Sequence, residues 1–206
     1  MIASAAASSP SSGRGGKPPV LLVVGDSLSA EYGIPRGSGW VALLEGRLAD
    51  QRLAWRVVNA SVSGDTTAGG RSRLPALLQR EKPSIVIVEL GGNDALRGLP
   101  LSATRDNLTA MVRAAKAAGA RVLIAGMQVP PNYGRQYGQD FAALFAEVAR
   151  AERTALVPFL LAGVADAADA EAMFQPDRIH PVAAAHPRIL DNVWPTLRPM
   201  LGAASR

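Results

Sequence analysis

Two apolar runs that end in small polar residues constrain the fold of this chain most. The first, Val20 to Val24, stops at Gly25-Asp26-Ser27, and the second, Ser84 to Leu90, is followed by Gly91-Gly92-Asn93. Runs of this length, rich in Val, Ile and Leu, predict strands buried on both faces, as in parallel sheets. Ligands of such sheets bind beyond the carboxyl ends of the strands, so we expect a functional site in the residues after these runs.

Strand-like and helix-like segments alternate along the rest of the chain. Further strands are expected at Arg56–Ala60, Arg121–Gly126 and Ala155–Leu161; helices at Gly39–Gln51, through Leu74 and Leu78, at Ser102–Ala118, around Phe141–Val148, and at Val182–Leu201, the last broken by Pro187, Pro195 and Pro199. Parallel neighbours need right-handed crossovers, so the alternation predicts an α/β fold: a three-layer α/β/α sandwich with a flavodoxin-like sheet of about five strands, order 2-1-3-4-5.

The length of 206 residues suits one domain, which we expect at residues 20–206. Residues 1–19 are rich in Ser, Ala, Gly and Pro and are expected to form a disordered leader without an apolar signal-peptide core. No stretch approaches the roughly 18 uninterrupted apolar residues of a membrane span. The 22 basic and 17 acidic residues give a net charge of +5, but the arginines are scattered, so no nucleic-acid partner is expected. The absence of cysteine excludes disulfides and thiolate catalysis.

Ser27 is a candidate nucleophile, because it follows a buried strand at the edge where sites form. The alternative is that Ser27 only caps the next helix. A serine nucleophile needs a base, and the chain has two histidines. Asp177 lies three residues before His180, close enough to hold its Nδ1–H and leave Nε2 to accept the serine proton; a plain surface turn is the alternative. His186 has no acid as near, so we expect it to be a surface or packing residue.

Donors for a developing oxyanion are available at the same strand ends. The Ser27 N–H, the unobstructed N–H of Gly64 and the side-chain amide of Asn93 would converge if the first and third strands are neighbours. Taken singly, Gly64 could instead form a turn and Asn93 could cap a helix.

Four blocks of this sequence resemble, in order and spacing, those of the SGNH (GDSL) hydrolases. They are Gly25-Asp26-Ser27-Leu28-Ser29, Ser63-Gly64-Asp65, Gly91-Gly92-Asn93-Asp94 and Asp177-Arg178-Ile179-His180. With Gly39-Trp40-Val41 and Pro131-Asn132-Tyr133-Gly134, the match is similar to the bacterial thioesterase I, arylesterase and lysophospholipase subgroup. The sequence departs from that subgroup at Arg178, where glycine is frequent, and at His186.

The resemblance implies a serine hydrolase that cleaves carboxylic esters and thioesters through an acyl-serine intermediate. Ser27 would be the nucleophile, His180 the base and Asp177 its orienting acid, with Ser27, Gly64 and Asn93 as the oxyanion hole. We expect substrate contacts from five residues, with Asp26 ordering its loop by hydrogen bonding: Asp26, Asp94, Val129, Pro130 and Tyr133.

The same resemblance implies that no metal or organic cofactor is required. The partners would be small acyl esters or thioesters, with transient contact to lipid substrates and no stable membrane insertion. A periplasmic or secreted location is implied, with the cytoplasm as the alternative.

Other functions remain open at this level. A carbohydrate O-deacetylase would use the same fold and the same reaction class. A phosphate-binding flavodoxin-like module would use Gly25 to Ser29 as an anion cradle, although no G-x-G-x-x-G or G-x-x-x-x-G-K-[ST] pattern follows any strand. A binding protein with a relic triad is a third possibility.

Overall fold

A single parallel sheet forms the middle layer of the computed structural model, which describes residues 17–202. Its strands are β1 (Val20–Gly25), β2 (Arg56–Asn59), β3 (Ile85–Glu89), β4 (Arg121–Ala125) and β5 (Ala155–Val157). All neighbours are parallel and the order is β2-β1-β3-β4-β5, which confirms the predicted topology. Most of the expected leader, residues 1–16, lies outside the described residues.

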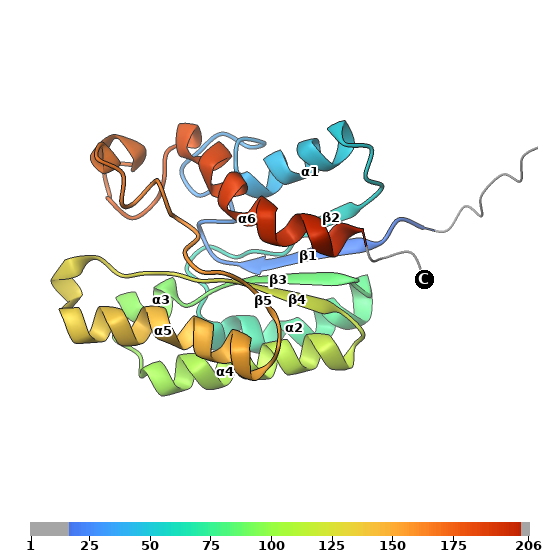
Figure 1. The fold of residues 1–206 in the computed structure, drawn as a ribbon, viewed down its shortest axis with the longest axis horizontal. Helices are drawn as coiled ribbons and strands as arrows, with labels where there is room; N and C mark the ends of the chain where they lie inside the picture. Colours follow the sequence, from blue (N-terminus) through green and yellow to red (C-terminus); the bar gives the residue numbers. More distant parts are fainter. Residues whose placement is uncertain (1–16, 203–206) are drawn as a thin grey trace, which may run out of the picture.

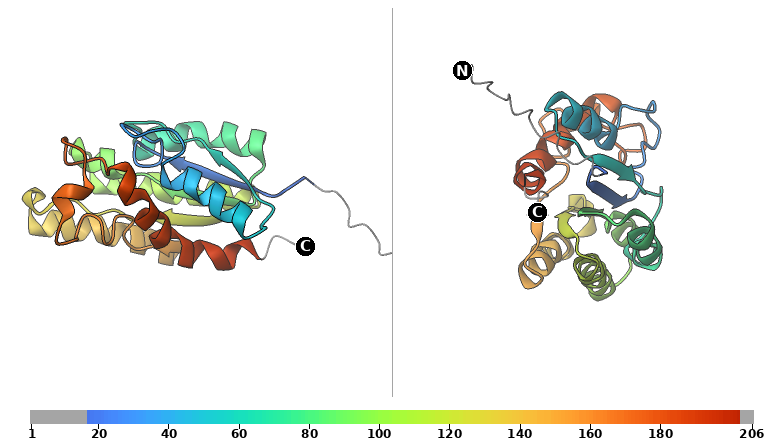
Figure 2. Two further views of the ribbon diagram at one scale, coloured as in Figure 1. Left: turned by 90° about the horizontal axis from the view of Figure 1, so that it is seen from above. Right: turned by 90° about the vertical axis from the view of Figure 1, so that its right-hand side faces the viewer.

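Helices cover both faces of the sheet, as Figure 1 and the view along the sheet in Figure 2 show. One face carries α1 (Trp40–Asp50) and α6 (His186–Leu201), which pack against each other. The other carries α2 (Thr67–Glu81), α4 (Leu101–Ala117) and α5 (Arg135–Ala151), while the short α3 (Gly92–Leu96) follows β3 directly. Three single turns of 3-10 helix complete the fold: η1 (Pro131–Tyr133), η2 (Ala170–Met173) and η3 (Ala183–Ala185).

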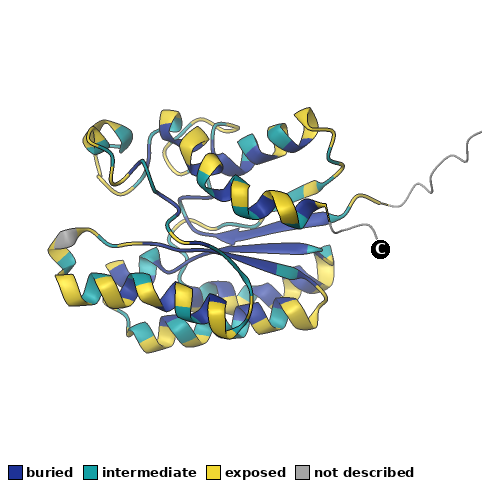
Figure 3. Ribbon diagram, in the orientation of Figure 1, coloured by how far each residue is buried: buried dark blue, intermediate teal, exposed yellow. Residues whose placement is uncertain are grey.

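The core explains why the apolar runs became central strands. In Figure 3 the middle strands are buried along their length, whereas the helices are buried only on the side that faces the sheet. Every residue of β1 and β3 is buried, and the edge strand β2 is more exposed. No helix among residues 17–202 is both long and apolar enough to cross a bilayer.

The last helix differs from the sequence-based expectation. The segment predicted as a helix broken by three prolines is one continuous helix from His186 to Leu201. Pro187 stands in the first turn, where an N–H has no helical partner to lose, and Pro195 and Pro199 lie on the exposed side. Burial of the opposite apolar face outweighs the missing hydrogen bonds: Ile189, Val193, Leu197 and Leu201 are all buried.

The fifth strand is also shorter than expected, because it ends at Val157, just before Pro158. The following residues, 158–169, form turns that lead to η2 and then to the loop that contains Asp177 and His180. The fold therefore brings a loop from near the end of the chain to the carboxyl edge of the sheet, where β1 and β3 lie side by side.

Candidate active site

The turn after β1 is held rigidly by its own hydrogen bonds. Asp26 is 2% exposed, and its Oδ1 accepts the N–H of Leu28 at 3.0 Å. The carbonyl of Asp26 accepts the N–H groups of Ser29 and Ala30 at 3.2 and 2.9 Å. These bonds fold residues 26–30 into a tight turn that leaves Ser27 half-buried, with its hydroxyl free to bond outside the turn.

That hydroxyl meets the imidazole of His180. Ser27 Oγ lies 2.8 Å from His180 Nε2, and His180 Nδ1 lies 2.7 Å from Asp177 Oδ2. Ser27 and His180 are 153 residues apart in the sequence, whereas Asp177 and His180 are three residues apart. The structure thus brings together all three residues predicted for the triad, in the predicted order of contact.

Asp177 is suited to hold an imidazole because it remains ionised. Its Oδ1 accepts the backbone N–H groups of Ile179 and His180, each at 3.0 Å. Partial desolvation acts to raise the pKa of Asp177, but these bonds and the contact with the His180 ring together lower it to about 2. The carboxylate can therefore fix Nδ1–H and leave Nε2 as the acceptor.

Arg178 occupies the left-handed region of backbone conformation, with φ of 56°. This conformation favours glycine, which the resembling subgroup often has here, because any Cβ is crowded by the following carbonyl. The exposed Arg178 guanidinium pairs with Glu171 at 2.8 Å. Arg178, at which this sequence departs from the subgroup, therefore has a strained backbone conformation in the loop that carries Asp177 and His180.

The predicted oxyanion donors come from the two strands that flank this turn. Asn93, in the first turn of α3, donates from Nδ2 to Asp26 Oδ2 at 3.0 Å. Gly64 has φ of 78°, which glycine adopts freely, and its carbonyl accepts a bond from Arg97 at 2.7 Å. Val62 N–H donates to the carbonyl of Gly25 at 3.0 Å, which ties the Gly64 loop to the end of β1. Asp26 thus connects the turn with Ser27 to Asn93. The bond from Val62 to Gly25 connects the loop with Gly64 to the strand that precedes this turn.

Two of the residues expected to contact substrate, Asp26 and Asp94, are buried and bonded within the protein. Asp94 is 2% exposed; it accepts bonds from the N–H of Thr67 at 2.9 Å, from the Thr67 hydroxyl, and from the Thr104 hydroxyl at 3.3 Å. Asp26 is equally buried, and its oxygens are taken by Leu28 and Asn93. Both carboxylates point into the protein because unpaired N–H and hydroxyl donors there need acceptors. Asp26 instead orders its loop, the role that its position beside Ser27 indicated.

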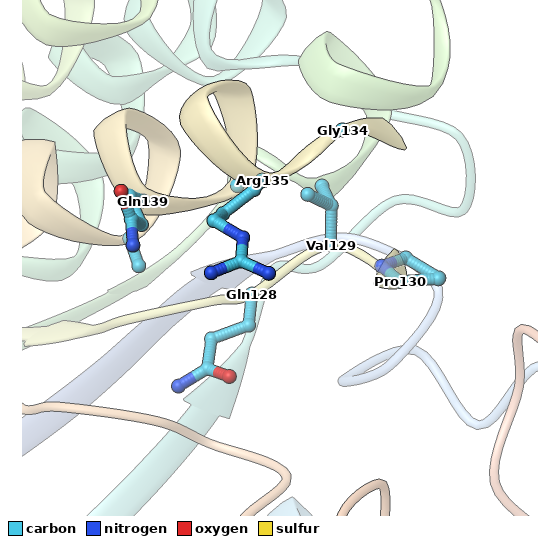
Figure 4. A pocket seen from close by; sticks show the side chains of 8 residues that line it. Gln128, Val129, Pro130, Gly134, Arg135 and Gln139 are labelled. Carbon is cyan, nitrogen blue, oxygen red and sulfur yellow. The ribbon is translucent and has the colours of Figure 1, made fainter. Parts of the chain in front are cut away.

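The other three expected contacts lie after β4, at the same edge of the sheet. Val129 and Pro130 line an open pocket of about 330 Å³, which Figure 4 shows between the segment after β4 and the first turns of α5. Six further residues line it: Gln128, Gly134, Arg135, Gly138, Gln139 and Ala142. Tyr133 is not among them; its ring stacks on Tyr137 with centroids 6.2 Å apart.

Sequence reasoning missed a buried network below the Ser27 turn. Glu89, the last residue of β3, is fully buried, and its Oε2 accepts the Asp26 N–H at 3.2 Å and the Ser29 hydroxyl at 2.7 Å. Trp40 Nε1 donates to the same hydroxyl at 3.1 Å. Burial, and then the nearby Asp26, raise the pKa of Glu89 well above its usual range. The sequence did contain a signal for this network, namely a glutamate, Glu89, in the otherwise apolar strand β3.

Burial also changes the ionisation of Asp26. It raises the pKa of Asp26 to about 6, although the bonds from Leu28 and Asn93 and the nearby His180 act to lower it. Two carboxyl groups with raised pKa values therefore lie beside the nucleophile turn, a pattern that is frequent at functional sites.

His186 proves to be a packing residue rather than a surface one. It is 2% exposed, and its Nδ1 accepts the N–H of Trp40 at 3.0 Å. Trp40 begins α1, whose preceding residue Gly39 offers no side chain to cap it. His186 thus supplies from α6 the acceptor that the start of α1 lacks.

The contacts from Ser27 to Asp177 form a Ser-His-Asp arrangement, and this fold and site together define a serine hydrolase. Residues 23–188 match the GDSL-like lipase/acylhydrolase family, and the chain belongs to that family.

Named relatives agree with this assignment. The chain is 56% identical to esterase TesA of Pseudomonas aeruginosa over 88% of this chain and 89% of that protein. It is 40% identical to thioesterase 1/protease 1/lysophospholipase L1 of Escherichia coli K12, over 88% of this chain and 84% of that protein. A crystal structure of TesA, 55% identical, superposes with a TM-score of 0.85 and covers 88% of this chain and 99% of its own.

Proposed function

We propose that this enzyme hydrolyses carboxylic esters and thioesters through an acyl-Ser27 intermediate. The observation that carries the proposal is the continuous contact from Ser27 Oγ through His180 to the carboxylate of Asp177. The names of the relatives, an esterase and a thioesterase/lysophospholipase, support the same reaction class.

The first half of the reaction forms the acyl-enzyme. Ser27 Oγ attacks the carbonyl carbon while its proton moves to His180 Nε2, only 2.8 Å away. The carbonyl oxygen becomes an oxyanion, which the N–H groups of Ser27 and Gly64 and the Asn93 amide would stabilise. The tetrahedral centre then collapses, the bond to the leaving oxygen or sulfur breaks, and His180 gives that atom its proton.

The second half returns the enzyme to its starting state. A water molecule attacks the acyl carbon and passes a proton to His180 Nε2. The bond to Ser27 Oγ breaks, the carboxylic acid leaves, and Ser27 recovers the proton. Asp177 stabilises the imidazolium in both halves through the contact at 2.7 Å.

The surface around the site favours substrates with an apolar acyl chain. Among the described residues, four large hydrophobic side chains are markedly exposed, each at 43% or more, in segments that follow the strands or carry His180: Tyr32, Val62 and Ile179 in loops, and Leu96 at the end of α3. The Tyr32 ring lies against the His180 ring, with centroids 4.3 Å apart. Apolar side chains left in water next to a reactive hydroxyl are suited to an alkyl or aryl acyl group, and to brief contact with lipid substrates.

Kinetics with p-nitrophenyl esters test the proposal. Ser27→Ala and His180→Ala should each lower kcat/KM by about 10⁴-fold or more, because they remove the nucleophile and the base. Ser102→Ala, which changes an exposed serine of α4, is the matched control and should retain wild-type rates. Undiminished turnover in Ser27→Ala would refute the proposed reaction.

A panel of acyl lengths separates the ester and thioester reading from a carbohydrate O-deacetylase. The proposed enzyme should accept octanoyl esters and acyl-CoA thioesters as well as acetyl esters. Acceptance of acetyl esters with rejection of octanoyl esters would favour the deacetylase, because its pocket need hold only a methyl group.

We further propose that residues 20–206 act as one catalytic domain and that the enzyme is exported to the periplasm or secreted. A single sheet with one continuous core supports the first point, and the family resemblance supports the second. Cell fractionation of the tagged full-length chain, with cytoplasmic and periplasmic marker enzymes, tests the location.

A further inference from the structure

The carboxylate of Asp26 joins two parts of the proposed machinery. Its Oδ1 accepts the Leu28 N–H at 3.0 Å, inside the turn that presents Ser27. Its Oδ2 accepts the Asn93 Nδ2 amide at 3.0 Å, from the start of α3. One buried side chain therefore contacts both the nucleophile turn after β1 and the amide that follows β3.

The second contact decides which end of the Asn93 amide can face the site. The oxygen and nitrogen ends of an asparagine amide have nearly the same shape, so hydrogen-bond partners determine its orientation. An ionised carboxylate only accepts hydrogen bonds, so it can face the NH₂ end but not the carbonyl end. That NH₂ group has two hydrogens: one bonds Asp26, and the other remains for an oxyanion.

The backbone of Asp26 is itself held in place by Glu89, at the end of β3. Its N–H donates to Glu89 Oε2 at 3.2 Å, and Gly25, the preceding residue, has no side chain in the way. A Cβ added at Gly25 would lie 2.6 Å from Glu89 Oε2. The close approach of the buried strand β3 to this turn thus holds the Asp26 backbone, and with it the direction of the carboxylate.

We propose that Asp26 is a positioning residue, which holds the Ser27 turn and orients the Asn93 amide with its nitrogen towards the oxyanion. This inference rests on the proposed function, because it assigns Asn93 to the oxyanion hole. Asp26 acts through Leu28 and Asn93 and does not itself touch the reacting atoms.

A substitution that separates the two contacts is Asp26→Asn. The new amide oxygen can still accept the Leu28 N–H, but its NH₂ group then faces the NH₂ group of Asn93. Two donors repel, so Asn93 turns over and presents its carbonyl oxygen to the oxyanion. Asp26→Ala removes both contacts.

The test is a double-mutant cycle with Asn93→Ala, read as kcat and KM on one p-nitrophenyl ester. Asp26→Asn should lower kcat about 10- to 100-fold with KM within about threefold, because an oxyanion bond strengthens only in the transition state. Added to Asn93→Ala, it should lower kcat no further, since no amide remains to orient. Asp26→Ala should still lower kcat in the Asn93→Ala background, because the Ser27 turn has lost its bond to Leu28.

Thr104→Val is the control for simple loss of a buried hydrogen bond, since Thr104 is buried and its hydroxyl bonds Asp94 rather than the nucleophile turn. Its effect on kcat should multiply with that of Asn93→Ala. Thermal melts of all variants show whether lost activity follows lost stability.

The outcomes distinguish the inference from the proposed function. If Asp26→Asn and Asn93→Ala multiply, as the control does, Asp26 does not orient Asn93 and the inference is wrong, while the reaction stands. If Ser27→Ala retains wild-type turnover, the proposed function itself fails. If Asp26→Asn acts mainly on KM, Asp26 affects substrate binding rather than the oxyanion, which also overturns the inference.

Discussion

We expect one buried histidine, His186, to contribute less to the stability of this fold as the pH drops below 6.5. His186 Nδ1 accepts the Trp40 N–H at 3.0 Å, so protonation at that nitrogen would break the bond. Burial lowers the pKa of His186 from 6.5 to about 4, although Glu31 acts to raise it. The folded protein therefore takes up this proton later than the unfolded chain does.

The sign and size of the effect follow from that difference. Above about pH 6.5 the histidine is neutral in both states and its contribution is complete. As the pH falls towards 4, only the unfolded chain binds the proton, so the free energy of unfolding decreases. A pKa lowered from 6.5 to about 4 corresponds to a loss of at most about 3 kcal/mol.

Urea unfolding followed by circular dichroism, between about pH 7.5 and about pH 4.5, measures this loss. His186→Asn is the reference variant, because its Oδ1 can accept the Trp40 N–H and does not titrate. The difference between the two proteins is the informative quantity, since Asp26, with its pKa raised to about 6, has the opposite effect on stability and is present in both. The wild type should lose stability faster than the variant as the pH falls. Parallel curves would refute the role assigned to His186.

Substitutions at three further positions test local features of the structure. Arg178→Gly should change the free energy of unfolding by less than about 1 kcal/mol in urea titrations, because relief of the left-handed conformation offsets the greater freedom of glycine. The β-branched Arg178→Val should be clearly less stable than Arg178→Gly, and equal stability would contradict the strain described. Gly25→Ala should destabilise the protein by about 1–3 kcal/mol, since its Cβ would lie 2.6 Å from Glu89 Oε2; an unchanged urea midpoint would show that this approach is not tight. Asp94→Ala should cost about 2–4 kcal/mol in thermal melts, because a buried N–H and two hydroxyls lose their acceptor. A raised KM with an unchanged melt would instead restore Asp94 as a substrate contact.

The sheet and the triad geometry were predictable from sequence because each rests on a strong local pattern. Apolar runs such as Val20–Val24 are typical of strands in the middle of a parallel sheet, and the strand order then places the residues after β1 and β3 together. With two histidines in the chain and an aspartate three residues before one of them, few pairings remained for Ser27.

The errors arose where tertiary packing decides the outcome. Pro195 and Pro199 indicate a helix break when read locally, but the buried face of α6 holds the helix together. Asp94 was expected to contact substrate and His186 was expected at the surface or in packing, whereas each is buried and accepts an N–H from a distant element. These N–H donors come close to Asp94 and His186 only in the folded protein. The sequence alone could therefore not predict that the two side chains are buried.

Labelling with a p-nitrophenyl phosphonate ester tests most directly whether His180 activates the Ser27 hydroxyl that it contacts. Ser27 Oγ should displace p-nitrophenolate and form one covalent phosphonyl adduct per chain, found by mass spectrometry in the peptide that contains Ser27. The rate of labelling should fall by orders of magnitude in His180→Ala, because this substitution removes the imidazole that contacts the hydroxyl and takes its proton. An adduct on another residue, or an undiminished rate in His180→Ala, would contradict the account.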